Sequence, residues 1–234
     1  MSPYPAPLRQ PTGCWSPGAA PTLKSLRTRV SVSVHRDGGV ALHDNSVADR
    51  DVVERFIKHR FHQAFGSRVD AFMPRLFSLR DADGVILGAF GLRGAAAALF
   101  LEQYIDASIE SEITSRTGVP CTRRGIVEVG HLSGTHAGVV RTMIGLLTCR
   151  LHEEGIRWVT FTGTASLRNA FHRLNLAPVE IAVARIERLP QAERSAWGRY
   201  YDDAPRVFVG NVQQGHRLLG LGSTPRSARL EIAQ

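Results

Sequence analysis

The residues best suited to chemistry lie in one stretch, from Arg123 to Gly138, which runs directly into a long amphipathic segment. A β-rich run over 124–130 is followed there by small residues and then by a predicted helix over 138–154. A strand that feeds a helix start exposes backbone N–H groups, and these attract anionic oxygens. The stretch therefore predicts a site for a pyrophosphate or a phosphopantetheine phosphate, although glycines before a helix also form simple tight turns. It is not a P-loop, because no Gly-Lys-Ser/Thr follows at the required spacing.

Two carboxylates in apolar surroundings are candidate bases. Glu128 lies between Val127 and Val129 in the β-rich run, where an alternating strand either exposes it or turns it inward. If it faces inward, burial raises its pKa and suits it to general base catalysis or to holding an ammonium group. Arg124 has the same side parity as Glu128 and belongs to the same predicted cluster. Glu102 is comparable, although the solvent face of a helix explains it equally well.

Two histidines flank the small-residue turn, and they are candidates for proton transfer near neutral pH. His131 and His136 have this position, while the nine histidines form no HxxxH or HxH pattern. No metal site is expected. Ser133 has His131 where a Gly-x-Ser-x-Gly elbow requires glycine, so serine hydrolase chemistry is not favoured.

The elements that must position these residues follow from periodicity. Amphipathic spacing predicts helices, and period-two or fully apolar runs predict strands. The expected strands are 29–36, 74–80, 84–92, 124–130, 158–162, 179–185 and 207–212, and the expected helical segments are 49–64, 95–104, 109–117, 138–154 and 166–174. The second and third strands form a hairpin, while later strand–helix–strand units require right-handed crossovers. The prediction is an α/β (α+β) fold with a mixed sheet and helices on both faces.

Composition and charge limit the partners of the chain. Its 234 residues are 43% hydrophobic and carry a net charge of +8, which suits one globular domain with appendages. Residues 1–36 contain five cations and no acid, and 216–234 contain three arginines and one glutamate, so only +1 remains for 37–215. A nucleic-acid-binding body is therefore not expected, because such a surface needs clustered cations. Residues 1–26 are predicted to be a disordered Pro-rich basic arm, 27–215 the folded domain, and 216–234 a flexible basic tail.

The three cysteines and the hydropathy of the chain indicate its compartment. Cys14, Cys121 and Cys149 have wide, unrelated spacings that give no disulfide framework. The N-terminus lacks the continuous apolar stretch of a signal peptide, and Arg93 interrupts the most apolar region, 84–101. The expectation is a cytoplasmic protein with no transmembrane segment.

Four blocks, in order, resemble the bacterial thermostable hemolysin family across roughly residues 30–215. The blocks are Phe100-Leu-Glu-Gln-Tyr-Ile-Asp106, Ile126-Val-Glu-Val-Gly-His-Leu132, Trp158-Val-Thr-Phe-Thr-Gly-Thr164 with Leu167-Arg-Asn-Ala-Phe171, and Trp197-Gly-Arg-Tyr-Tyr201 with Pro205. The family's Glu-Val-Gly block usually continues with Asn-Leu, whereas this chain has His131 in place of the Asn. That family in turn resembles a divergent branch of the GNAT acyltransferases, nearest in layout to the acyl-homoserine-lactone synthases.

The resemblance implies an N-acyltransferase that uses an acyl thioester of acyl carrier protein or coenzyme A and a small amine or amino acid. Glu128 falls where the synthases have a glutamate at the end of their central strand. Gly130-His131-Leu132 replaces their Ser-Arg-Phe, and residues 134–138 occupy the phosphopantetheine-binding loop without its full pattern. The candidate residues are Glu128, Glu102, His131, Tyr200 and Tyr201 for catalysis; Gly134, Thr135, His136, Ala137, Gly138 and Asn169 for the acyl donor; and Arg124, Phe161 and Trp197 for the substrate.

Other interpretations stay open from the sequence alone. Trp197 and the two tyrosines that follow it also suit a packed aromatic cap on the sheet. A membrane-active cytolysin is the main alternative function, although no cationic helix has the clean apolar face that lipid insertion requires. A catalytically inactive binding module of the same fold is another. For the enzyme, the basic arm and tail would help to dock an acidic carrier protein, since complementary charge speeds encounter.

Overall fold

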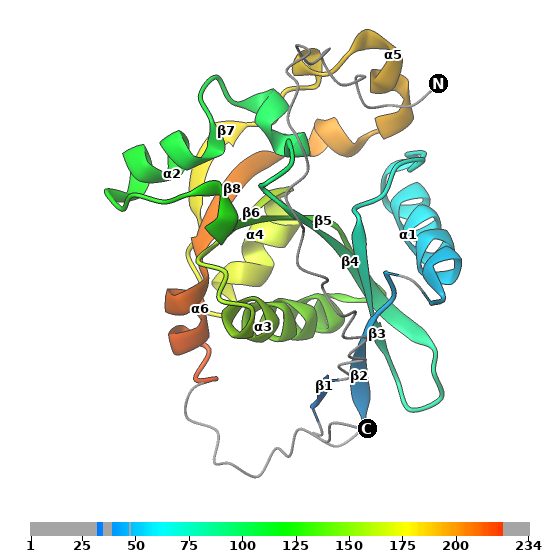
Figure 1. Ribbon diagram of the computed structural model, residues 1–234. Coiled ribbons are helices and arrows are strands. Elements are labelled where there is room, and N and C mark those ends of the chain that lie inside the picture. The colour runs from blue at the N-terminus through cyan, green and yellow to red at the C-terminus, as the bar shows by residue number, and fades with distance from the viewer. Residues whose placement is uncertain (1–31, 35–38, 47, 222–234) are drawn as a thin grey trace, which may run out of the picture.

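A single eight-stranded sheet organises the protein, in the order β1-β2-β3-β4-β5-β6-β8-β7 (Figure 1). The structure, a computed structural model, describes residues 32–34, 39–46 and 48–221. The predicted arm over 1–26 and the part of the predicted tail beyond residue 221 lie outside the described residues. The strands are β1 (Val32–Val34), β2 (Val40–Asp44), β3 (Arg75–Arg80), β4 (Ile86–Gly94), β5 (Ile126–Gly134), β6 (Trp158–Gly163), β7 (Val179–Val183) and β8 (Arg206–Asn211).

Helical segments connect the strands and cover both faces of the sheet. The α-helices are α1 (Arg50–Phe65), α2 (Ile109–Thr117), α3 (Ala137–Glu153), α4 (Ala165–His172), α5 (Gln191–Arg194) and α6 (Val212–Leu218). The 3-10 turns are η1 (Phe100–Tyr104), η2 (Arg123–Gly125), η3 (Ile186–Arg188), η4 (Ser195–Trp197) and η5 (Tyr200–Asp203). The predicted fold class, a mixed sheet with helices on both faces, is confirmed.

Strand direction separates the two halves of the sheet. From β1 to β5 every neighbouring pair is antiparallel, and β3 and β4 form the predicted hairpin. β5 and β6 are the parallel pair, and β8 then pairs antiparallel with both β6 and β7. α3 makes the crossover from β5 to β6, as a parallel connection requires. The parallel pair therefore lies in the middle of the sheet.

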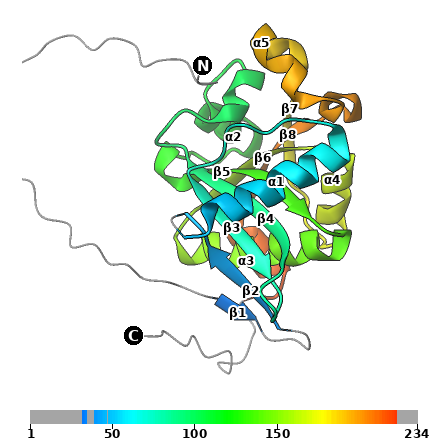
Figure 2. The ribbon, with the colours of Figure 1, turned by 90° about the vertical axis from the view of Figure 1, so that its right-hand side faces the viewer.

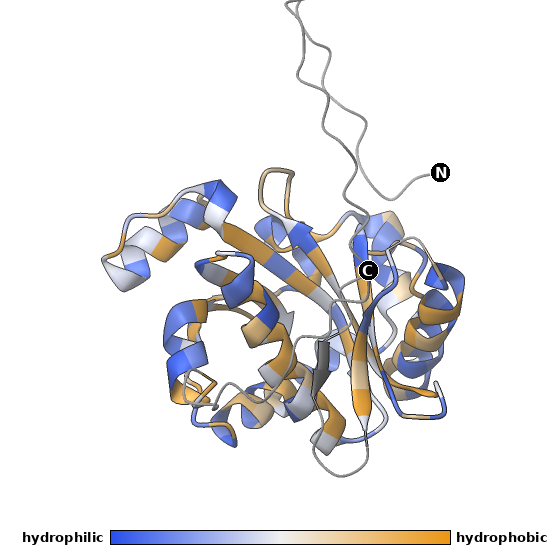
Figure 3. Cartoon of the chain, turned by 60° about the horizontal axis from the view of Figure 1, so that its bottom comes forward, coloured by the Kyte–Doolittle hydropathy of each residue, from blue (hydrophilic) through white to orange (hydrophobic). Residues whose placement is uncertain are grey.

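The helices α1 and α3 pack on opposite faces, as Figures 1 and 2 show together. α3 buries the predicted stripe of apolar residues against β4, β5 and β6: Val139, Met143, Leu146, Leu147 and Leu151. α1 buries Val53 and Ile57 against β3 and β4. In Figure 3 the helices alternate between hydrophilic and hydrophobic residues, which is the pattern of a helix with one buried face.

On the α1 face, a second layer covers β5 to β8. η1, α2 and the segment 191–203 pack there on Ile126, Trp158 and Val209. Two backbone hydrogen bonds join that segment to the end of α1, from Arg68 N–H to Ala196 O (2.7 Å) and from Arg199 N–H to Phe65 O (2.8 Å). Gly198 permits this approach because an added Cβ would lie 2.3 Å from the Phe65 carbonyl oxygen, and its φ is 53°.

The structure differs from the sequence predictions at several boundaries. β2 was not predicted. The run predicted as a strand over 124–130 begins only at Ile126 and continues to Gly134, so the prediction that Arg124 shares a strand face with Glu128 is wrong. Arg124 lies in the turn η2 and is exposed. β8 ends at Asn211, where Asn211 caps α6 by accepting the Gln214 N–H, and α6 runs past the predicted domain end at residue 215. Within residues 39–46 and 48–221, no helix is long and apolar enough to cross a membrane.

Candidate active site

The two parallel strands separate in the middle of the sheet. Pairing between β5 and β6 runs from Ile126 and Trp158 only as far as Val129 and Phe161, although both strands continue. Beyond that point β5 stays paired with β4 as far as Gly134, and β6 stays paired with β8 as far as Gly163. A slot therefore opens between the strands, and the backbone groups that face it have no strand partner across it.

A bulge in β5 accounts for the separation. The register between β4 and β5 shifts between Ala89 and Gly91, and His131 there has a φ of 58°. Such a bulge turns two successive side-chain positions to one face and bends the strand. An added Cβ on Gly130 would lie 2.5 Å from Met73, and the His131 ring lies against Phe61 and Phe72, so both positions face α1.

A cavity of about 740 Å³ passes through this slot. Alternation along β5 and β6 divides its lining into two parts. We call the part beneath α1 and the 191–203 segment the α1-side chamber; it is lined chiefly by Phe61, Phe65, Met73, Phe100, Tyr104, Glu128, His131, Thr162, Trp197 and Tyr200. We call the part between the sheet, α3, α4 and α6 the α3-side chamber; it is lined chiefly by Val129, Leu132, Leu147, Thr148, Leu151, Phe161, Leu167, Phe171, Leu176, Val212 and Gly215.

Glu128 is the buried acid of the α1-side chamber. Its side chain is 3% exposed, and its two oxygens accept the N–H groups of Phe100 (2.9 Å) and Leu101 (3.0 Å) at the start of η1. Burial raises the pKa of Glu128 to about 7, and the two N–H bonds and the charge of Arg93 oppose this shift. The inward orientation left open by the sequence is therefore the one that the structure shows. Glu128 both fixes the η1 turn and supplies an acid that titrates near neutral pH.

The raised pKa predicts how stability depends on pH. Folded Glu128 retains a proton that the unfolded chain releases between pH 4.5 and about 7. Its favourable contribution to the free energy of unfolding is complete below pH 4.5 and is lost as the pH rises through about 7. The loss amounts to about 3 kcal/mol. Urea unfolding of the wild type and of Glu128→Gln at several pH values measures this dependence of stability on pH. The difference in unfolding free energy between the two should change across that window, and a constant difference would contradict the raised pKa.

His131 and Thr162, which both line the α1-side chamber, have buried polar atoms without a partner among the described residues. The His131 Nδ1 and the Thr162 Oγ1 are buried, and neither has a hydrogen-bond partner within the described part of the chain. Burial lowers the pKa of His131 to about 4, while a hydrogen bond to the Ala71 backbone acts in the opposite direction. The imidazole is therefore neutral at pH 7, and its free Nδ1 is a hydrogen-bond acceptor. Buried polar atoms without partners cost free energy, which favours a role in holding a ligand.

Aromatic rings also line the α1-side chamber. Trp197 contacts Phe100 and Tyr200, with ring centroids 5.6 and 5.4 Å apart. Tyr200 is 9% exposed, and its hydroxyl donates to the Thr162 carbonyl oxygen (3.5 Å). Burial raises the pKa of Tyr200, so its hydroxyl keeps its proton at neutral pH. Tyr104 also lines the chamber, and its hydroxyl forms a short hydrogen bond with that of Tyr201.

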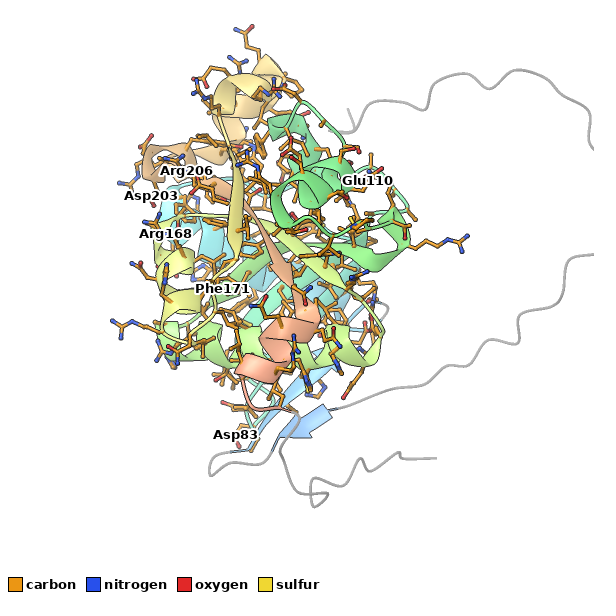
Figure 4. All side chains as sticks on the ribbon, turned by 90° about the vertical axis from the view of Figure 1, so that its left-hand side faces the viewer. Asp83, Glu110, Arg168, Phe171, Asp203 and Arg206 are labelled. Carbon is orange, nitrogen blue, oxygen red and sulfur yellow. The ribbon has the colours of Figure 1, made fainter. Side chains whose placement is uncertain are left out.

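The α3-side chamber is apolar in character. Phe161, 4% exposed, stacks on Phe171 of α4 at 4.8 Å and on Phe208 at 5.4 Å. Figure 4 labels Phe171 and, on the same helix, Arg168, which is exposed. Among the described residues that line this chamber none is charged. The predicted substrate residue Phe161 thus lies at the slot and faces this chamber.

Glu102, Tyr201 and Asn169 are predicted site residues that lie outside the cavity lining. Glu102 is held by Arg123 through two hydrogen bonds (2.6 and 2.9 Å) and accepts the Leu99 and Ile109 N–H groups. The Arg123 bond is the largest cause that lowers the pKa of Glu102, so this carboxylate has a structural role in the fold. Tyr201 contacts three residues that line the cavity, Tyr104 through its hydroxyl and Trp197 and Tyr200 through its ring. Burial raises its pKa to about 12. Asn169 is exposed on α4.

The predicted donor loop, residues 134–138, lies at the outer end of β5 and the start of α3. The His136 Nδ1 accepts the Gly138 N–H (3.2 Å), and the Gly134 carbonyl oxygen accepts a hydrogen bond from Arg60 of α1 (2.7 Å). His136 and Gly138 line a second, open hollow together with Arg141. The loop is therefore next to the slot but does not line the large cavity.

Sequence reasoning did not single out several residues that line the α1-side chamber. Tyr104 and Thr162 lie in the quoted blocks, but neither received a role. Phe61 and Phe65 of α1, and the loop 67–71 that follows it, were not associated with the site. The aromatic spacing of α1 was a usable signal, because two rings four residues apart share one helix face.

Comparison with known proteins identifies the class of fold. Solved structures with the same fold include FeeM, an N-acyl amino acid synthase from uncultured soil microbes, with a TM-score of 0.54, 15% identity, and coverage of 80% of this chain and 97% of that chain. The AHL synthase LasI gives a TM-score of 0.53 at 10% identity, covering 77% and 93% of the two chains. TofI, in a ternary complex with an inhibitor and MTA, gives a TM-score of 0.51 at 14% identity, covering 77% of this chain and 96% of that chain. The chain therefore has the same fold as these proteins.

The family assignment is equally direct. Residues 43–216 match the thermostable hemolysin family, and the chain belongs to that family. The resemblance drawn from the four sequence blocks is thereby confirmed. A search of curated proteins found no match.

Proposed function

We propose that this protein is an N-acyltransferase that transfers a fatty acyl group from a phosphopantetheine thioester to a small amine or amino acid. The observation that carries the proposal is the slot between β5 and β6 and the cavity that passes through it. An extended pantetheine arm has the width and the amide groups of a strand, so it can bind to the strand edges that face the slot. The thioester would then lie at the middle of the sheet.

The two chambers suit the two halves of the reaction. The α3-side chamber has the apolar lining that a fatty chain requires, since each buried methylene contributes about 0.8 kcal/mol. The α1-side chamber has Glu128, His131 and Tyr200, which suit the acceptor amine and its proton. The donor chain and the acceptor would therefore approach the thioester carbon from opposite faces of the sheet. Holding both reactants in place is itself a large part of such catalysis.

The buried polar groups have distinct roles in the proposed reaction. The amine nitrogen forms a bond to the thioester carbon, the C–S bond breaks, the amine loses one proton, and the leaving thiolate gains one. Glu128, with a pKa of about 7, is ionised often enough at neutral pH to take the amine proton, directly or through water. His131 would serve as a neutral acceptor that orients the amine N–H. Tyr200, protonated at this pH, supplies a proton toward the thiolate.

The donor's phosphate is assigned to residues 134–138. The start of α3 directs backbone N–H groups outward next to the slot, and Arg141 adds a positive charge in the same hollow. Coenzyme A and acyl carrier protein share this phosphopantetheine chemistry. The basic residues of the arm and tail favour an acidic carrier protein as partner.

Acceptor-dependent release of thiol tests the proposed function. Purified protein is mixed with dodecanoyl thioesters of coenzyme A and of acyl carrier protein, each with a panel of amines and amino acids, and a thiol reagent follows release. Release that requires both donor and acceptor, with the amide detected by mass spectrometry, is expected. No release with either donor and any acceptor would contradict the proposal. Dye leakage from liposomes caused by the protein alone would instead support a direct lytic activity.

A further inference from the structure

The charges that line the cavity are unevenly placed. Within the described lining the ionisable acids are Asp70, Glu128 and Glu193, and the one arginine is Arg68. Arg68 and Asp70 are exposed, so they lie at the opening, whereas Glu128 is buried inside. His131 is neutral because its pKa is lowered to about 4. The interior of the α1-side chamber therefore offers one carboxyl group, which is partly ionised at neutral pH, and no positive charge from its own lining.

Other groups that could receive a carboxylate near this chamber are already engaged. The first N–H groups of η1 point inward, but Glu128 occupies those of Phe100 and Leu101. Arg93 is opposite Glu128 in the β4–β5 ladder, but it does not line the cavity, and its guanidinium donates to the Ala98 carbonyl (3.5 Å). An acceptor carboxylate inside the chamber would therefore lie close to Glu128 without a cation of its own. A buried charge without a partner is strongly disfavoured.

The aromatic lining of the chamber favours a cation over a carboxylate. Phe65 meets Tyr200 edge to face at 5.1 Å, and Trp197 packs on Phe100 at 5.6 Å in the same chamber. Aromatic faces attract an ammonium group and pack against apolar or aromatic bodies. A carboxylate has neither interaction with these rings. The lining thus fits a positively charged head group on an apolar body.

We propose that the acceptor is a primary amine with an aromatic or apolar body and no carboxylate, and that it binds in the α1-side chamber. This inference rests on the proposed function and narrows its acceptor. The amine reaches the chamber as an ammonium ion held by Glu128 and the rings. One proton of the ammonium passes to Glu128, and the neutral nitrogen bonds to the thioester carbon. The C–S bond then breaks, Tyr200 gives a proton to the leaving thiolate, and the second proton lost by the nitrogen replaces it on Tyr200.

Matched pairs of acceptors test the inference. Phenethylamine with phenylalanine, tyramine with tyrosine, and tryptamine with tryptophan differ only in the carboxylate. With a dodecanoyl donor, kcat/KM for each amine should exceed that for its amino acid about 30-fold or more, which corresponds to about 2 kcal/mol. Equal or better use of the amino acids would overturn the inference while leaving the acyltransferase function intact. No thiol release with any acceptor would overturn both.

Variants of Trp197 connect the preference to the chamber. Trp197→Leu removes the ring and should raise KM for tryptamine about tenfold with a smaller change in kcat, whereas Trp197→Phe keeps a ring and should stay within about threefold of the wild type. Binding of tryptamine alone, measured as a thermal shift, should weaken in the leucine variant and persist in the phenylalanine variant. An unchanged KM in both variants would place the acceptor elsewhere and overturn the inference.

Discussion

Glu128→Gln is expected to lower kcat for acyl transfer by about 10²- to 10⁴-fold, the range typical of losing one general acid–base group. The variant keeps the shape of the side chain but removes its ability to take a proton at pH 7. The reaction rate with saturating donor and acceptor, followed by thiol release, measures the effect. Activity near that of the wild type would show that another group takes the amine proton.

The same substitution also disturbs a structural contact. Only one oxygen remains to accept from Phe100 or Leu101, and the amide N–H group would face the other N–H. A buried donor left without a partner costs about 1–3 kcal/mol. A loss of activity caused by the missing proton acceptor must therefore be distinguished from one caused by a change in the conformation of η1.

Glu102→Gln is the matched control for this separation. Glu102 also accepts backbone N–H groups in the η1 region, from Leu99 and Ile109, but its carboxylate lies outside the cavity lining. We expect it to lower the unfolding free energy by a comparable amount, about 1–3 kcal/mol, with kcat within about threefold of the wild type. If both variants lose activity equally, the effect belongs to the η1 turn and Glu128 is only structural.

The sequence predicted elements well where one periodicity was strong. The limits of α2 agree exactly with the predicted 109–117, and α3 and β6 agree closely, because their apolar spacing matches one buried face. The site itself was less predictable, since β5 is buried on both faces over residues 126–129 and alternation could not orient Glu128. Small residues after Gly130 suggested a turn. The bulge at His131 instead lets the strand continue along β4.

The chamber lining depended on contacts that no local pattern contains. Loop 67–71 joins the site because the Arg68 N–H donates to the Ala196 carbonyl oxygen, and both residues line the cavity. Tyr104 became a lining residue because Glu128 holds the start of η1 from a strand far away in the sequence. The isolated charge of Glu102 appeared catalytic in the sequence, and only its pairing with Arg123 shows a structural role. Family resemblance drew attention to Glu128 because it compares an ordered series of blocks and not one pattern, and the structure shows that Glu128 is buried in the cavity lining.

Gly215→Phe is expected to convert the protein from long-chain to short-chain acyl donors. Gly215 of α6 lines the α3-side chamber, where an added Cβ would meet Thr148 at 3.5 Å and Leu176 at 3.8 Å, which is ordinary contact. A phenyl ring placed there would fill space that a fatty chain needs. Excluding four methylenes at about 0.8 kcal/mol each costs about 3 kcal/mol, or roughly 10²-fold in kcat/KM.

Comparison of chain lengths measures this effect. The dodecanoyl donor should lose about 10²-fold in kcat/KM, while the butanoyl donor should change by less than about threefold, since its chain ends before the blocked space. Gly215→Ala is the matched control, because its methyl group fits and it favours the helix by up to about 1 kcal/mol. Its chain-length profile should equal that of the wild type. If Gly215→Phe uses the dodecanoyl donor as well as the wild type does, the acyl chain does not enter the α3-side chamber, and the proposed placement of donor and acceptor on opposite faces of the sheet is wrong.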